Sequence, residues 1–403
     1  MPERLVDVLI IGAGPAGMLC ACLLARAGLS VTVLERNEDF EREFRGEILQ
    51  PRFHRVLQDV GLHGVLQAYP HEEIGEAHVY FEGQRAGGLR LDRLDARAGP
   101  AWWMTQPTLL RALHNHSRES KGFELWFGAA VKELGEGSAT VTWKGEFHRL
   151  QARVIVGADG RFSSVRKLAG LDVAYDHHDL DVVWFNLPRP VGYEHVFSFF
   201  LTLRRAFLIL PKYPNLLQCG MVLRPGEFNS VIRQRPLAEF QAQLAAAHPA
   251  IAEFALGLRD FSPFFPLKGN LSCAGNWAKD GLLLIGDAAH TCSPVGGIGV
   301  AIAMETAAVA ADVILEAFES GDFSRRQLGK VQAARARDIA RVHAFQRRVG
   351  RLVRMPPLLR RLIPLGFRLA TGLGVAPLIA RQLITRQGPL PIGRVSGSDG
   401  AAN

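Results

Sequence analysis

Cysteine is scarce in this sequence, and the cysteines that occur form no pattern. Five cysteines among 403 residues exclude a small fold stapled by disulfides. No Cys-x-x-Cys pair and no tight group of cysteine and histidine is present, so we predict no metal site. Hydrophobic residues make up 48% of the chain and charged residues 21%, which is the composition of a globular protein with a large core.

Long uncharged apolar runs are missing as well. Outside the stretch 8–25, the longest candidate is 369–380, with twelve residues, whereas a bilayer span needs roughly 18–20. The apolar stretch 8–25 resembles a signal peptide at first sight, but the glycines within it and the acid that follows it have a better explanation, given below. We therefore expect a cytoplasmic protein.

Acidic residues are almost absent from the C-terminal part of the chain. Residues 321–394 hold 16 lysines and arginines but only two acids, a net charge of +14, and the remaining chain carries −6. No helix-turn-helix, zinc finger or RNA-binding motif accompanies this charge, so we expect no nucleic-acid partner. The arginines mix with leucine, isoleucine and valine in an amphipathic helical pattern that prolines interrupt from Pro356 onward.

Two interpretations of this basic segment remain open. It forms a helical cap over the body of the protein, which we assign to 327–395. Alternatively, the same cap also makes loose peripheral contact with an anionic membrane surface through 327–394, from which a hydrophobic substrate would enter. Residues 396–403 are predicted to be disordered.

The N-terminal segment contains a strand, a glycine turn, a helix, a second strand and an acid, in that order. Residues 5–11 form an apolar, β-branched run, typical of a strand buried on both faces of a parallel sheet. The turn Gly12-Ala13-Gly14-Pro15-Ala16-Gly17 precedes a helical pattern over 18–27, and the strand 29–34 ends at Glu35. Glycines permit the tight turn, the approach of a pyrophosphate and close packing of the helix, whose N-terminus attracts phosphate. The segment therefore predicts a dinucleotide site, without separating FAD from NAD.

Two further loops follow predicted strands much later in the chain. The strand 153–156 runs into Gly157-Ala158-Asp159-Gly160, with Arg166 shortly after. The strand 281–285 runs into Gly286-Asp287-Ala288-Ala289-His290 and then Pro294 and Gly296-Gly297-Ile298-Gly299, before a helical pattern over 300–319. Weaker marks are Arg45-Gly46-Glu47-Ile48-Leu49-Gln50-Pro51 and Gln106-Pro107-Thr108-Leu109-Leu110 at the head of a helix.

In these motifs and their order the chain resembles the FAD-dependent aromatic hydroxylases of the p-hydroxybenzoate hydroxylase type, the group A flavoprotein monooxygenases. The resemblance implies an α/β fold, with a Rossmann-type FAD-binding domain, an inserted mixed β-sheet substrate domain and a C-terminal helical segment. We divide the chain accordingly: the FAD-binding domain is 1–74, 100–172 and 268–326, and the substrate domain is 75–99 and 173–267.

The resemblance also implies roles for individual residues. Those assigned to FAD are Gly12, Gly14, Ala16 and Gly17 at the pyrophosphate, Glu35 at the ribose, Arg36 and Val131 at the adenine, Arg45, Gln106 and Asp287 along the ribityl and pyrophosphate, and Asp159 at the pyrophosphate and the nicotinamide cofactor. Pro294, Gly297, Ile298 and Gly299 would lie at the reacting face of the flavin. The start of the 300–319 helix can direct N–H groups at the flavin ring, which is anionic when reduced.

Some residues depart from the family pattern or have a plain structural alternative. Ala301 stands where the family commonly has Asn, and Glu305 where it has Asp. His290 is either a catalytic base or a histidine that packs the loop, and Cys292 either a reactive thiol or a buried filler. Arg45 belongs either to the site or to a solvated charged loop, and Trp102-Trp103 either to the substrate pocket or to the core.

Between 174 and 266 the pattern changes to strands over 182–187, 195–203, 206–210 and 216–223, without intervening helices, and 75–92 adds further strands. The p-hydroxybenzoate enzyme holds its substrate carboxylate with a Ser-x-Arg pair in this sheet. The matching segment here is Phe207-Leu208-Ile209-Leu210-Pro211-Lys212, so that clamp is absent. A pocket with Phe199, Phe200 and Leu210 suits an apolar ring system.

The resemblance implies the reaction. NADPH or NADH reduces FAD, which then forms a C4a-hydroperoxide with O₂ and hydroxylates an apolar, aromatic or polycyclic substrate. No catalytic side chain is identified beyond the Pro294 and Gly297 region. A flavin-dependent reductase of a hydrophobic, prenyl-type substrate on the same fold is the alternative, and a non-catalytic carrier of a hydrophobic ligand is a further one.

Overall fold

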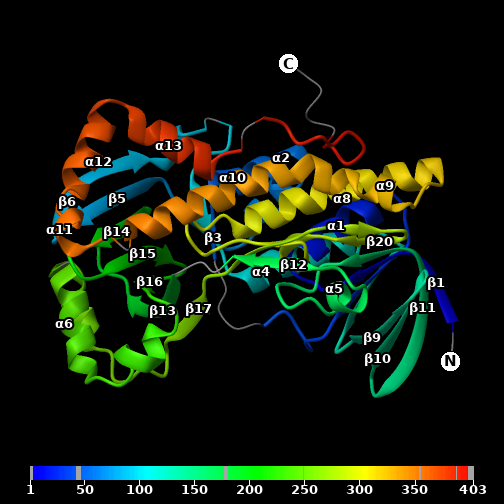
Figure 1. The fold of residues 1–403 in the computed structure, drawn as a ribbon, viewed down its shortest axis with the longest axis horizontal. Coiled ribbons are helices and arrows are strands. Elements are labelled where there is room, and N and C mark those ends of the chain that lie inside the picture. Colours follow the sequence, from blue (N-terminus) through cyan, green and yellow to red (C-terminus); the bar gives the residue numbers. More distant parts are fainter. Residues whose placement is uncertain are drawn as a thin grey trace.

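A computed structural model describes residues 3–41, 47–95, 97–176, 180–247, 249–353, 355–386 and 388–397 (Figure 1). Two large sheets organise this part of the chain. One carries helices α1, α8 and α10 along it, and the other lies beside it, with α12 and α13 near its edge strand β6 and α6 on one face (Figure 1).

The eight-stranded sheet is built from distant parts of the sequence. Its strands are β1 (Glu3–Ile11), β2 (Val31–Glu35), β8 (Phe123–Phe127), β9 (Ala130–Gly135), β10 (Ser138–Trp143), β11 (Glu146–Gly157), β19 (Ala278–Lys279) and β20 (Leu282–Leu284). The order β20-β11-β1-β2-β8 is parallel throughout. Val8, Leu9 and Ile10 are fully buried, as a strand covered on both faces requires. The predicted α/β fold with a Rossmann-type sheet is confirmed.

Helices α1 (Pro15–Arg26), α4 (Gln106–Ser117) and α8 (Gly299–Ser320) pack together beside this sheet, and α5 (Ser164–Leu168) follows β11. Proline suits the first position of α1, because the N–H that it lacks would have no partner within the helix. Helix α8 ends at Gly321, whose φ of +70° is the left-handed conformation of a helix stop.

The seven-stranded sheet is mixed, as predicted. Its strands are β5 (Glu76–Phe81), β6 (Gln84–Arg90), β13 (Asp181–Pro188), β14 (Val196–Leu201), β15 (Ala206–Lys212), β16 (Leu216–Leu223) and β17 (Phe265–Lys268). The order is β17-β13-β16-β15-β14-β5-β6, and within it only β14 and β5 are parallel. The early hairpin β5-β6 therefore completes a sheet whose other strands come from the middle of the chain.

The expectation that no helix interrupts 174–266 is wrong. Helices α6 (Leu237–Ala247) and α7 (Pro249–Leu256) follow β16, after a π-helical turn at Phe228–Ile232. Phe240, Leu244 and Ile251 bury themselves against one face of the seven-stranded sheet. The helical spacing of these apolar residues and the alanines between them were a signal for helix that the strand pattern obscured.

Two three-stranded sheets join the large ones. The first has the order β3 (Ile48–Leu49), β7 (Ala101–Trp103), β4 (Glu72–Ile74), and the second β12 (Val173–Asp176), β18 (Leu271–Ala274), β21 (His290–Thr291). Helices α2 (Pro51–Asp59) and α3 (His63–Gln67) follow β3, and a short turn of helix occupies Leu91–Arg93. The first of these sheets brings the segment after residue 47 against both large sheets.

The basic C-terminal segment is helical and broken at prolines, as predicted. It contains α9 (Arg325–Leu328), α10 (Lys330–Val353), α11 (Pro357–Arg360), α12 (Ile363–Gly372) and α13 (Val375–Ile384). Helix α10 runs along α8, and α12 contacts β6 (Figure 1). The chain then returns to the body, where Asp312 Oδ1 accepts hydrogen bonds from the N–H groups of residues 393–395.

Within the described ranges no single helix is both long and apolar enough to cross a membrane. One bent pair, Leu358–Gly372 with Val375–Gln382, meets the length and composition criteria jointly, with 94° between its halves. Of the tail predicted to be disordered, 398–403 lies outside the described residues, while the N–H of Gly397 donates to the Asp59 carbonyl. The division of the chain into three domains stays a prediction.

Candidate active site

The glycine turn after β1 leaves open space in front of the first helix. A Cβ atom at Gly12 would lie 2.4 Å from the Ala158 carbonyl oxygen, and one at Gly17 would lie 1.9 Å from the Gly12 carbonyl oxygen. Side chains are thus excluded where β1, α1 and the β11 loop touch. At Gly14 no atom lies within 4 Å of the corresponding position, and no side chain caps α1. The N–H groups of the first turn of α1 therefore face a space that an anion can enter.

Glu35 closes one side of this turn. It ends β2, is almost fully buried, and its Oε2 accepts from the N–H of Ala13 at 3.0 Å. Its Oε1 accepts from the backbone and side-chain nitrogens of Asn37. Arg36 beside it is exposed, and Arg45 lies outside the described residues. The carboxylate is therefore held in a fixed position beside the glycine turn.

The loop after β11 is fastened to the loop after β20. Arg166, fully buried, donates from Nη1 to the carbonyl of Ala288 at 2.7 Å and from Nη2 to the carbonyl of Arg161 at 3.0 Å. Asp159 accepts from Ser163 Oγ and from the N–H groups of Ser164 and Val165, and so caps α5. These contacts place Asp159 in the support of its own loop, and they do not test its predicted role at the cofactor.

The other predicted cofactor residues lie around the same edge of the sheet. Ala16 packs on Gly286 at the end of β20, where an added Cβ atom would lie 2.9 Å from the Ala16 methyl group. Asp287 follows directly and is half-buried. Gln106 begins α4, behind the cap that Thr105 provides, and Val131 lies in β9, paired with Val141. The structure thus brings the three glycine motifs together at the carboxyl ends of β1, β11 and β20.

The loop of Pro294 to Gly299 is held from two directions. Gln50 Nε2 donates to the Gly296 carbonyl at 2.9 Å, and a Cβ atom at Gly297 would lie 2.2 Å from Ile48 Cγ2. Gly297 adopts a φ of +61° and donates to the Pro294 carbonyl. Only glycine satisfies both the conformation and the close approach.

The second support of this loop comes from α10. Gln346, with no exposed surface, accepts from the Ser293 N–H and donates from Nε2 to the carbonyls of Ser293 and Val295, at 2.8–3.1 Å. The loop then enters α8, where Ile298 is buried and offers no side-chain cap. The N–H groups at the start of α8 are therefore available to a ligand.

His290 and Cys292 take the structural alternatives. His290 is buried, its Nε2 lies 2.9 Å from Thr306 Oγ1, and burial together with nearby Arg335 lowers its pKa to about 3. Burial raises the pKa of the Cys292 thiol, which keeps it protonated and unreactive. Trp102 and Trp103 are both buried in apolar clusters. A neutral, packed histidine and an unreactive thiol are consistent with a loop that binds its ligand through backbone N–H groups.

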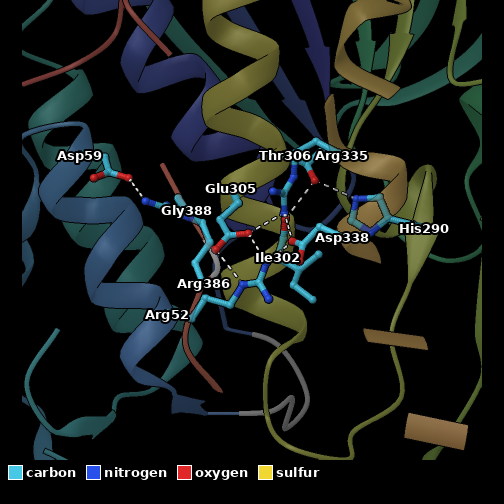
Figure 2. A network of polar contacts seen from close by, with 10 residues as sticks. All are labelled: Arg52, Asp59, His290, Ile302, Glu305, Thr306, Arg335, Asp338, Arg386 and Gly388. Carbon is cyan, nitrogen blue, oxygen red and sulfur yellow. Dashed lines mark hydrogen bonds and ion pairs between the residues drawn. The ribbon is translucent and has the colours of Figure 1, made fainter. Parts of the chain in front are cut away.

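Below this loop, α2, α8 and α10 share a buried group of charges, the Glu305 network, which consists of Arg52, Glu305, Arg335 and Asp338 (Figure 2). Arg52 donates from Nε and Nη2 to the two oxygens of Glu305, at 2.7 and 2.6 Å. Arg335 also pairs with Glu305, and both arginines pair with Asp338. Burial alone would raise the pKa of Glu305, but the two guanidinium groups lower it below its usual range.

The predicted substrate residues fall on opposite faces of the seven-stranded sheet. Leu210 lies in the cluster that faces β3 and β7, and the pairing of Phe199 with Leu208 puts it on the same face. Phe200 points the other way, fully buried against Tyr80, with ring centroids 4.6 Å apart. Successive side chains of a strand alternate, so Phe200 cannot line a pocket with the other two, and this part of the prediction is corrected.

Two charged residues beside the face of the seven-stranded sheet that carries Leu210 were missed as candidates. Glu47, just before β3, is buried, and its Oε2 lies 4.0 Å from Nζ of Lys212, the last residue of β15. Lys212 also lies over the ring of Trp103, 5.2 Å from its centroid. Glu47 stood inside a segment used for the family resemblance, and Lys212 inside the segment from which the Ser-x-Arg clamp is absent, so neither was considered as a site residue. Burial of Glu47 could not be read from the charged stretch that precedes it.

Tested against these observations, the site fits FAD. The space at Gly14 suits a pyrophosphate, and Gln50 Oε1 is a buried acceptor without a partner among the described residues, beside the Gly296 loop. Hydroxyl and ring N–H groups of a ribityl chain and flavin are donors of the required kind. Within the described ranges no three histidine, cysteine, aspartate or glutamate side chains are grouped so as to hold a metal ion.

Comparisons with known proteins agree with this geometry. The family described as FAD binding domain matches residues 5–345. A 6-methylpretetramide 4-monooxygenase from Streptomyces rimosus is 33% identical over 354 residues, which cover 84% of this chain and 82% of that protein. Two solved structures share the fold. A p-nitrophenol 4-monooxygenase from Pseudomonas putida has a TM-score of 0.80 at 18% identity, covering 96% of this chain and 100% of that one. An anhydrotetracycline hydroxylase from Streptomyces rimosus has a TM-score of 0.74 at 24% identity, covering 96% and 77%.

The match over 341 of the 403 residues and the one-third identity to a monooxygenase confirm what the three glycine motifs predicted. The protein is an enzyme that uses FAD, with NAD(P)H as the reductant typical of its class. The chain belongs to the FAD-binding domain family and, within it, to the group A flavoprotein hydroxylases.

Proposed function

We propose that this monooxygenase hydroxylates an apolar, polycyclic aromatic substrate. The observation that carries the proposal is the apolar inner face of the seven-stranded sheet, with Phe197, Leu208 and Leu210, which meets the segment supporting the Gly296 loop. The identity to an enzyme named for 6-methylpretetramide, a polycyclic aromatic compound, supports the same class of substrate. A flat apolar wall binds fused rings through area and excludes water from the reacting atoms.

The chemistry that FAD supplies when bound is acceptance of hydride from NAD(P)H and activation of O₂. The chain's own part is to bind and orient. The N-terminus of α1 and Gly14 would hold the pyrophosphate, Glu35 the ribose, and Arg36 and the backbone of Val131 the adenine. Gln106 and Asp287 would hold the ribityl chain, and Gly297, Ile298 and Gly299 would present N–H groups to the flavin ring, where they stabilise negative charge.

The test is a screen of phenols, quinones and fused-ring aromatics for stimulation of NAD(P)H oxidation by the purified protein. We expect a fused-ring compound to stimulate the rate most, with consumption of O₂ and a product heavier by one oxygen atom. A product heavier by two hydrogen atoms, formed without consumption of O₂, would support the reductase alternative instead. Reduction of bound FAD by NAD(P)H already distinguishes an enzyme from a carrier.

Glu35→Ala tests the proposed arrangement of the cofactor. The ribose hydroxyls lose a charged acceptor, which contributes about 1.5–3 kcal/mol. We expect weaker binding of FAD and partly colourless protein, measured as the FAD dissociation constant after dialysis. Arg4→Ala, which breaks an exposed pair with Glu124 on the same sheet, is the control and should leave FAD bound. Stoichiometric FAD in the Glu35 variant would contradict the assignment.

We propose further that the C-terminal segment contacts an anionic membrane surface. Residues 358–379 expose nine large apolar side chains, namely Leu358, Leu359, Leu362, Leu365, Leu369, Leu373, Val375, Leu378 and Ile379. Half of the exposed large apolar side chains in the described structure lie in this short stretch. Arg361, Arg368 and Arg381 are exposed beside them, and the sequence has no acid between 339 and 394. Exposed leucines with arginine and no acid are typical of an interfacial helix.

Sedimentation with vesicles tests this contact. We expect the protein to bind phosphatidylglycerol vesicles at low salt, to bind less at high salt, and to ignore phosphatidylcholine vesicles. Each exposed arginine contributes about 1 kcal/mol near an anionic surface. Absence of binding to anionic vesicles at low salt would leave the segment as a cap only.

A further inference from the structure

Glu47 has a buried carboxylate oxygen that accepts no hydrogen bond from the described residues. The residue is 7% exposed, and its Oε2 has no hydrogen-bond partner among the described residues. Within the described ranges the cation paired with it is Lys212 Nζ, 4.0 Å away and beyond hydrogen-bond distance. A carboxylate is costly to bury, and a buried carboxylate normally fills its acceptor positions.

Glu305 shows how this chain buries a carboxylate for structural purposes. Both of its oxygens accept from guanidinium groups, and no acceptor is left open. Among the described residues Glu47 Oε2 accepts no such hydrogen bond, and Lys212 Nζ lies 4.0 Å from it. The difference indicates that Glu47 is placed for a partner that comes from outside the chain.

The position of Glu47 is the one where substrate and flavin would meet. Its backbone carbonyl accepts from the Met104 N–H at 3.0 Å, which fixes the segment before β3. The next residues of this segment support the flavin loop, since Ile48 packs on Gly297 and Gln50 bonds to Gly296. Glu47 is therefore tied to the loop that is proposed to face the reacting atoms.

Through Lys212, Glu47 also lies beside the apolar face of the seven-stranded sheet that carries Leu208 and Leu210. Lys212 is on the same face of β15 as Leu210, because the two are separated by one residue. The Trp103 ring lies under the Lys212 ammonium, and its Nε1 donates to the buried Gln218. Glu47 and Lys212 thus place one negative and one positive group beside the apolar side chains of Phe197, Leu208 and Leu210.

The electrostatics suit proton exchange near neutral pH. Burial raises the pKa of Glu47 to about 7, and Lys212 opposes this rise. Lys212, from β15, is the charged group that acts on it. On β7 the neighbours are Trp103 and Met104, which do not titrate, and on β4 the Glu72 carboxylate is paired with Arg189 at 2.8 Å. A carboxylate poised in this way can take up and return a proton during turnover.

We propose that Glu47 accepts the proton of an ionisable hydroxyl group on the aromatic substrate, while Lys212 stabilises the oxyanion that is left. This inference rests on the proposed function and names the polar feature of its substrate class. The substrate O–H bond breaks, an O–H bond forms at Glu47 Oε2, and the electron pair stays on the substrate oxygen. No electron leaves either partner in this step. The electron-rich ring is then more reactive toward oxygen transfer, and the proton returns to the same oxygen of the product.

Binding of two matched probes to the oxidised holoenzyme tests the proposal without turnover. The probes are 2-hydroxyanthraquinone and anthraquinone, which differ by one hydroxyl group. Their affinities are measured by difference absorbance at about pH 6 and about pH 8, on either side of the Glu47 pKa of about 7. We expect the wild type to prefer the hydroxylated probe by at least about tenfold at the higher pH, and by much less at the lower, because an ionised carboxylate is the stronger acceptor.

Glu47→Gln should remove both the preference and its pH dependence, while the affinity for anthraquinone stays unchanged or rises. Lys212→Met should move the pH dependence to higher pH, since the carboxylate loses the cation that favours its charged form. Glu72→Gln, a matched change on the neighbouring strand β4, should behave as the wild type. A wild type without preference, or a Glu47→Gln variant that keeps it, would overturn the proposal. If Glu47→Gln fails to fold, an unmoved pH dependence in Lys212→Met overturns it equally.

Kinetics separate this inference from the proposed function. With a hydroxylated substrate found in the screen, Glu47→Gln should lower kcat about a hundredfold or more and change KM little, and the acid limb of the wild-type pH profile should vanish. An enzyme that hydroxylates such a substrate regardless of Glu47 sinks this inference alone. A wild type that binds the probes as expected, but never inserts oxygen into any aromatic compound, sinks the proposed function and leaves the Glu47 site standing.

Discussion

Two helices of the C-terminal segment depart from the usual distribution of residues, in which charged side chains are exposed and apolar ones are buried. In α10, Arg335 lies in the interior and pairs with Glu305, whose side chain has no exposed surface. Near the end of α12, about 35 residues further along the chain, Leu369 and the C-cap residue Leu373 are exposed, the latter at 76%. Arginine and apolar residues mix in both helices, but α10 has six arginines among its 24 residues and α12 has one among its ten. The arginine-rich helix contributes a buried arginine to the Glu305 network, and the more apolar helix exposes leucines.

The reason lies in what each helix meets. Helix α10 packs along α8, where Glu305 is already buried and requires cations. Helices α11 to α13 lie over the edge of the seven-stranded sheet at β6, a strand with half-buried side chains, and they have one side without a protein partner in the described structure. Burial of an arginine is thus decided by the partner helix and not by the segment that carries it.

The largest effect on stability is expected from disrupting the Glu305 network. Glu305→Ala leaves Arg52 and Arg335 buried with only the partly exposed Asp338, so we expect a loss of about 3–5 kcal/mol in the free energy of unfolding. Denaturant unfolding of the holoenzyme measures it. Glu316→Ala, an exposed acid on the same helix α8 that pairs with Lys330, is the matched control and should change little.

The stability that the Glu305 network contributes should also depend on pH. Because the pKa of Glu305 is lower in the folded than in the unfolded state, its contribution is complete above the unfolded value of about 4.3. It is lost as the pH falls through the folded-state pKa. The difference in stability between the wild type and Glu305→Ala should therefore shrink in acid. A difference that stays constant from neutral to strongly acid solution would mean that Glu305 is not held by its charge.

An intermediate effect is expected at Gln346, where α10 reaches the flavin loop. Gln346→Leu keeps the volume but removes the hydrogen bonds that the Ser293 N–H and the Ser293 and Val295 carbonyls make with Gln346, at a cost of about 1–3 kcal/mol. We expect weaker FAD binding and a changed flavin absorption spectrum as well. Gln332→Leu on the same helix, which loses bonds to Gly275 and Trp277 away from that loop, should lower stability yet leave the spectrum alone. Equal spectral changes in both variants would contradict the positioning role.

The smallest effect on folding is expected on the outer face. Replacing Leu365, Leu369 and Leu373 together by serine removes side chains that are 56–76% exposed, so the stability should change by less than about 0.5 kcal/mol for each residue. Binding to phosphatidylglycerol vesicles should nevertheless fall strongly. Replacing buried Ile339 of α10 by serine is the contrast, with a large loss of stability. A triple variant that unfolds as readily as the Ile339 variant would show that the outer face is covered in solution.

The sequence predicted the parts of the fold that local patterns dictate. Strand β1, the glycine turn and helix α8 have short-range signals in periodicity, glycine and proline, and the structure has them within a few residues. Helices α6 and α7 were missed because their apolar residues were taken together with the strands before them. Phe200 was misplaced because the face of a strand depends on register, which one residue reverses.

The site was predictable where backbone conformation requires a residue type, as at Gly12 and Gly297. It was not predictable where the chemistry arises from distant contacts. Glu47 and Lys212 are 165 positions apart, and nothing local marks either as buried beside the other. Gln346 likewise acts on Ser293 across a loop and a long helix. Such pairs exist only once the sheets and helices are assembled.

The strand order of the eight-stranded sheet also bears on how the protein is made. Strand β1 is synthesised well before its neighbours in the sheet, since β11 ends at Gly157 and β20 at Leu284, and Gln346 comes later still. Every strand of the seven-stranded sheet is complete once Lys268 has been added. On the ribosome the substrate side can therefore pair all its strands while the N-terminal glycine turn still waits for the neighbours that close its pocket. The complete cofactor site therefore exists only after Gln346 has been synthesised, later than every strand of the substrate side.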